Sequence, residues 1–154
     1  MITTNQCQVY LTQLIADWFA NADPAFDVPI TAENIKAYNT TPNEQSVSPN
    51  WCIVAGVNTI SEAFVSAGDR FPARLVILLY ARLNKAAAHA EASREAAERW
   101  INDAEEMLMQ NLAEVDQTDY WYEVTVPIPP RRDPDRLYWR NYRTTQIVVD
   151  IDKK

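Results

Sequence analysis

The sequence predicts an α+β domain: a mainly antiparallel sheet of about four to five strands, with an N-terminal helix and one long helix packed on one face. The periodic segments follow in the order helix, strands, helix, strands. Only two glycines, Gly56 and Gly68, occur in 154 residues, so neither the Rossmann nor the P-loop pattern is present. This length fits a single domain, residues 1–154.

Residues 5–20 repeat apolar side chains at helical spacing, which predicts an amphipathic helix. Thr4 or Asn5 would cap its start, and residues 21–24 would stop it. Its apolar positions are Val9, Leu11, Leu14, Ile15, Trp18 and Phe19. The next stretch is less regular: residues 34–40 favour a short edge strand over a helical turn capped by Thr31.

Residues 51–57 predict a strand with Trp51, Ile53, Ala55 and Val57 on one face. Its predicted partner is residues 74–83, reached through a turn at residues 66–69. The partner strand is apolar on both faces, and such a strand is normally covered on both. We therefore expect the domain's own helices on one face and another subunit on the other.

Residues 87–112 predict the longest helix, with an inward stripe flanked by Trp100 and Met107. The stripe residues are Ala97, Ile101, Ala104, Leu108 and Leu112. The charged residues Glu91, Arg94, Glu95, Glu98 and Glu105 are predicted to form a mostly solvated face. Two alternating strands should follow, at residues 120–126 (Tyr120, Tyr122, Val124, Val126) and 145–151 (Ile147, Val149, Ile151).

The formal net charge of −7 argues against a general affinity for nucleic acid, because phosphates would be repelled. No apolar run approaches the roughly 18 residues of a membrane span, and the N-terminus lacks the pattern of a signal peptide. The two cysteines, Cys7 and Cys52, are predicted to be reduced and buried in a cytoplasmic setting.

The single histidine, His89, is the most obvious candidate for metal binding or general-base chemistry, with Glu91 and Glu95 nearby. A catalytic zinc needs three protein ligands, so one histidine among alanines is better interpreted as a surface or packing residue. No serine lies in a nucleophile-elbow pattern, and the adjacent Glu105 and Glu106 look like a solvated helix face. We expect no catalytic residues, no metal and no cofactor.

Residues 127–143, PIPPRRDPDRLYWRNYR, are the one basic segment of this acidic chain. Five arginines against two aspartates give this segment +3, which leaves −10 for the rest. Arginine mixed with tyrosine and tryptophan is typical of protein-interface hot spots, and also of single-strand nucleic-acid platforms. We rank a protein interface first, pairing with the chain's own acids second, and nucleic acid a distant third. The predicted interface residues are Arg131, Arg132, Arg136, Tyr138, Trp139, Arg140, Tyr142 and Arg143.

Three segments, "NWCIVAGV", "RLVILLYARLNKAAAHAEASREAAERW" and "TTQIVVDIDKK", together resemble the tail terminator proteins of long-tailed bacteriophages. The resemblance lies in the pattern and order of elements over most of the chain; residues 21–50 and the basic segment have no counterpart in it. It implies a structural virion protein that forms a homohexameric ring, assembled in the host cytoplasm. Such a ring caps the tail tube and docks with the head-connector or stopper protein. DNA would pass through without specific binding, since an acidic lumen repels phosphates.

Other hypotheses remain beside this one. Another phage neck or head–tail joining protein, an adaptor or stopper, would share its size and charge. A small cytoplasmic enzyme or ligand-binding domain would use the sheet's free face, and an RNA-binding module would use the basic segment. A ring of six subunits distinguishes the tail hypothesis from a compact monomer with a deep pocket.

Overall fold

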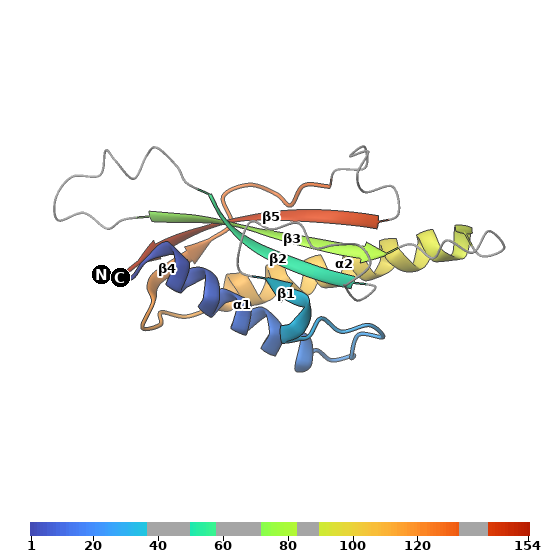
Figure 1. Cartoon of the computed structure of the whole chain (residues 1–154), viewed down its shortest axis with the longest axis horizontal. Helices are drawn as coiled ribbons and strands as arrows, with labels where there is room; N and C mark the ends of the chain where they lie inside the picture. The colour runs from blue at the N-terminus through green and yellow to red at the C-terminus, as the bar shows by residue number, and fades with distance from the viewer. Residues whose placement is uncertain (37–49, 58–71, 83–89, 133–141) are drawn as a thin grey trace.

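The computed structural model describes residues 1–36, 50–57, 72–82, 90–132 and 142–154 (Figure 1). Its five-stranded sheet has the order β1-β2-β3-β5-β4, with β1 parallel to β2 and every other neighbouring pair antiparallel. The elements are α1 (Thr4–Ala20), the 3-10 turn η1 (Ala32–Asn34), β1 (Ile35–Lys36), β2 (Asn50–Val57), β3 (Pro72–Arg82), α2 (Ala90–Glu114), β4 (Trp121–Thr125) and β5 (Tyr142–Lys153).

The predicted fold class is confirmed: a four-strand antiparallel sheet carries the N-terminal helix and one long helix. Both helices lie on the same side of the sheet, and the two chain ends lie together (Figure 1). The amide of Ile2 donates a 3.1 Å hydrogen bond to the carbonyl of Lys154, which joins the two ends. Among the described residues, the other face of the sheet carries no helix.

Helix α1 begins one residue earlier than predicted, so the predicted caps Thr4 and Asn5 are wrong. Thr3 is the cap, and it forms a capping box with Gln6 in which each side chain bonds the other's backbone amide. The predicted stripe is confirmed at Leu11, Ile15 and Phe19 but not at Val9, which is 43% exposed. The adjacent Gln8 is buried instead, because its amide bonds the sheet.

The β2–β3 pair forms as predicted, with Trp51 opposite Tyr80 and Ile53 opposite Leu78. Leu75, Ile77 and Leu79 face the helices and are fully buried. The other face carries a second buried cluster of Trp51, Ile53, Tyr80 and Tyr142. Both faces of β3 are therefore apolar, as predicted; contact with another subunit stays a prediction. The predicted turn at residues 66–69 lies outside the described residues.

The two alternatives predicted near residue 34, a helical turn after Thr31 and a short edge strand, occur one after the other. A 3-10 turn over Ala32–Asn34 follows Thr31, whose backbone carbonyl accepts from the amide of Asn34 at 2.9 Å. Strand β1 follows over Ile35–Lys36, and residues 37–40 lie outside the described part.

The predicted inward stripe of the long helix is confirmed at all five of its positions. Trp100 is 8% exposed, whereas Met107 is only partly buried. The helix continues to Glu114, two residues past its predicted end. Through this apolar stripe, α2 packs against β3 and β5.

The predicted alternation holds at Tyr120, Val124 and Val126, which pack against the core. It is wrong at Tyr122, because β4 contains an irregularity between Trp121 and Glu123. This shift inserts an extra residue, so Trp121 and Val124 face the helices. Trp121 is fully buried, and Tyr122 is 41% exposed. The indole of Trp121 donates a 3.3 Å bond to the carbonyl of Asp116.

Cys7 and Cys52 are buried free thiols, as predicted. Burial raises the pKa of the Cys52 thiol far above its usual range. Burial also raises the pKa of the Cys7 thiol, opposed by the nearby positive charge of Lys153. Both thiols are therefore protonated at neutral pH, which makes them poor nucleophiles.

Candidate protein-interaction surfaces

The two ends of the basic segment are held on one flank of α2 by an ion network. Arg132 approaches Glu105 at 3.3 Å and Glu98 at 3.5 Å, and Arg143 pairs with Glu98 at 2.5 Å. The hydroxyl group of Thr145, a buried residue of β5, donates a hydrogen bond to the carboxylate of Glu105. These four charged side chains are 22–44% exposed, so each pair contributes little stability. They bring residues 132 and 143 to the same flank of α2.

The predicted loop is shorter than residues 127–143, because its last two residues belong to β5. Tyr142 is 3% exposed in the aromatic cluster, where its ring meets that of Trp51 edge-on at 6.1 Å. Arg131 is exposed, and its backbone forms an isolated antiparallel bridge with Gln146 through two 2.8 Å hydrogen bonds. The chain therefore returns to the edge of β5 after β4 ends.

Of the predicted interface residues, the structure brings Arg132 and Arg143 together at Glu98. Tyr142 lies in the aromatic cluster on the other face of the sheet. Pairing with the chain's own acids, the second-ranked interpretation, thus occurs for these two arginines. Arg136, Tyr138, Trp139 and Arg140 lie outside the described residues. For them, and for the exposed Arg131, a protein interface stays a prediction.

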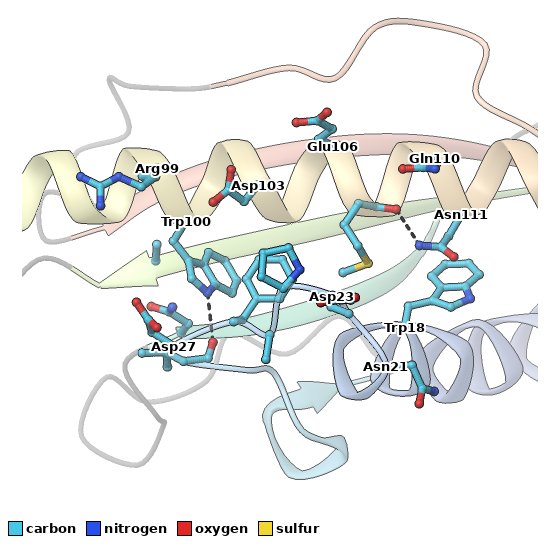
Figure 2. Close-up of a pocket in the computed structure, with 18 of the residues that line it drawn as sticks. Trp18, Asn21, Asp23, Asp27, Arg99, Trp100, Asp103, Glu106, Gln110 and Asn111 are labelled. Atoms are coloured by element: carbon cyan, nitrogen blue, oxygen red, sulfur yellow. Dashed lines mark hydrogen bonds between the residues drawn. The ribbon is translucent and has the colours of Figure 1, made fainter.

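A groove of about 750 Å³ runs between α2 and the chain segment that leaves α1 (Figure 2). Trp18 of α1 lies on one side, and Trp100 of α2 lies on the other. The indole of Trp100 stacks on Phe19 at 5.8 Å and donates a 3.0 Å hydrogen bond to the carbonyl of Val28. Both tryptophans lie on the predicted apolar sides of their helices and pack against the core, but Trp100 is buried whereas Trp18 is half-buried and lines the groove.

The groove is acidic. Five carboxylates against two arginines line it, which gives the lining a net charge of −3. Asp103 and Glu106 come from α2, and Asp23 and Asp27 come from the opposite wall (Figure 2). Within the described part of the chain, the ion pairs involve none of these four carboxylates. A groove with aromatic walls and uncompensated acids suits a partner that carries arginine and aromatic side chains.

The described residues contain no group of three or more metal-ligating side chains. His89 lies outside the described residues, so its role as a surface or packing residue stays a prediction. Among the helices that the structure describes, none is long and apolar enough to cross a membrane.

Comparison with protein-family models, with curated proteins and with solved structures found no match to this chain.

Two features of these surfaces were missed from the sequence. Glu98 and Glu105, predicted to lie on a mostly solvated face, are 44% and 22% exposed but also contact Arg132 and Arg143; the sequence did not single them out as these partners. Their seven-residue spacing, which places both on one flank of a helix, was the available signal. The groove had no such signal, because its walls come from residues 18–28 and from a helix some seventy residues later.

Proposed function

We propose that this chain is a structural subunit of a tail terminator ring, which caps the tail tube of a long-tailed bacteriophage and meets the head-connector or stopper protein. The observation that carries the proposal is the arrangement of its elements: two helices on one face of an antiparallel sheet, with β2 and β3 preceding the long helix and β5 ending the chain. This is the order on which the resemblance to that family rests.

The ion network supports a role in assembly. Glu98 contacts both Arg132 and Arg143, so the two ends of the segment lie at one place on α2. That segment contains Arg136 and Trp139, residue types that dominate interface energetics. A binding segment whose two ends are fixed loses less conformational entropy when it docks.

The charge of the chain supports the same proposal. An acidic ring repels DNA phosphates, so DNA passes without adhering. The chain's −7 would be multiplied by the number of subunits around the lumen.

The double variant Arg136→Ala/Trp139→Ala tests the proposal. It should keep the parent circular dichroism spectrum but sediment as smaller species, and should fail to cap purified tail tubes. Normal assembly, combined with loss of binding to single-stranded RNA or DNA, would replace the ring proposal with the nucleic-acid hypothesis.

A further inference from the structure

We infer that the groove between α2 and the chain segment that leaves α1 is the docking site for residues 136–140, RLYWR, of a second copy of this chain. The inference rests on the proposed ring, because it names the contact that joins one subunit to the next.

The chemistry of the groove and that of the segment are complementary. Trp18 and Met107 are half-buried in the groove wall, so they offer apolar surface to an incoming aromatic side chain. Asp27 and Asp103 lie on opposite walls and are exposed, so they accept hydrogen bonds from guanidinium groups (Figure 2). The sequence RLYWR supplies two arginines flanking a tyrosine and a tryptophan. A groove of about 750 Å³ lies within the size range of ligand sites, so it has room for large side chains.

The structure favours a second copy over the chain's own segment. Arg132 and Arg143 hold the ends of their segment at Glu98 and Glu105, which lie on the flank of α2 beside β5. The groove is lined by the other flank of α2, which includes Arg99, Asp103 and Gln110. Residues five apart point to nearly opposite sides of a helix, so Glu98 and Asp103 face different neighbours. The two anchored ends of the segment and the groove thus lie on different sides of α2, an arrangement compatible with a head-to-tail ring.

Charge reversal in trans tests this contact. The groove variant is Asp27→Lys/Asp103→Lys, and the segment variant is Arg136→Glu/Arg140→Glu. The control variant, Asp119→Lys/Glu123→Lys, makes the same charge change as the groove variant at two exposed carboxylates outside the groove. Circular dichroism and thermal melting check folding, and sedimentation equilibrium measures self-association of each protein alone and of equimolar mixtures.

We expect each reversed variant alone to associate at least about tenfold more weakly than the parent, and the control to associate normally. The equimolar mixture of groove and segment variants should recover association, because every groove again meets a segment of opposite charge. Recovery also excludes misfolding as the cause of the loss.

Rings that form equally well in both reversed variants would overturn the inference and leave the proposed function standing. Charge-dependent association that never closes into a ring would uphold the inference and count against the proposed function. A parent chain that stays monomeric at every concentration would overturn both.

Discussion

The side-chain amide of Gln8 on α1 donates a 3.0 Å hydrogen bond to the backbone carbonyl of Val54 on β2. Both residues are buried, and the contact lies just past the two residues of β2 that pair with β1. A β-carbon added at Gly56 would lie 3.2 Å from Oε1 of Gln8. Gly56 therefore leaves space for this side chain, and α1 is joined to the sheet by a polar contact in addition to its apolar stripe.

Replacing Gln8 with alanine should lower the free energy of unfolding by about 1–3 kcal/mol, because the buried carbonyl of Val54 loses this partner. Urea denaturation of the purified protein measures the change. Gln13→Ala is the matched control, since Gln13 is exposed on the same helix and should change stability by less than about 0.5 kcal/mol. Equal effects of the two substitutions would show that the Gln8 contact contributes no specific stability.

Trp100→Ala should cost on the order of 3–5 kcal/mol, because a buried indole leaves a cavity and the carbonyl of Val28 loses its donor. Trp18→Ala should cost clearly less, since Trp18 is half-buried in the groove wall. Thermal melting of the two variants ranks them. If Trp18→Ala were the more damaging change, the assignment of Trp18 to the groove wall would be wrong.

The ion pair between Glu98 and Arg143 should be weak. Both side chains are 30–44% exposed, so a double-mutant cycle with Glu98→Gln and Arg143→Gln should give a coupling energy below about 1 kcal/mol. The coupling should shrink further in about 1 M salt, where screening is strong. A coupling well above this value, insensitive to salt, would instead identify a desolvated pair that holds the fold together.

Stability should fall at alkaline pH through Cys52. Burial raises its pKa above the ordinary thiol value of 9.0, so the folded state holds this proton more tightly than the unfolded chain does. The contribution is therefore fully present below pH 9 and is lost as pH rises from there toward the folded pKa. At pH 10 the loss should be on the order of 1 kcal/mol.

Urea unfolding of the parent and of Cys52→Ala at pH 7 and pH 10 measures this effect. Cys52→Ala should be less stable at pH 7, because it leaves a cavity, but its stability should fall less between the two pH values. Parallel losses in the two proteins would mean that Cys52 does not titrate differently on folding.

The sequence predicted those parts of the fold that depend on local periodicity. The stripe of α2 and the two-faced pattern of β3 each repeat over enough residues to determine which side chains are buried. The face of Trp121 could not be predicted in this way. It depends on the irregular pairing of β4 with β5. The sequence of β4 alone does not indicate such a contact between strands.

The surfaces could be predicted only in part. The composition of residues 127–143 marked an unusual segment, but its anchoring at Glu98 and Glu105 depends on how β5 lies beside α2. Gln8 was missed because a buried amide in an apolar stripe resembles an exposed residue until its partner on β2 is known. Contacts across elements are set by tertiary packing, which single-sequence periodicity does not record.

The measurement that tests the central proposal most directly is the solution mass of the purified full chain, combined with negative-stain images of the same sample. We expect a closed ring with six-fold symmetry and six times the 17.6 kDa mass of one chain. A monomer at every concentration, with no rings in the images, would contradict it.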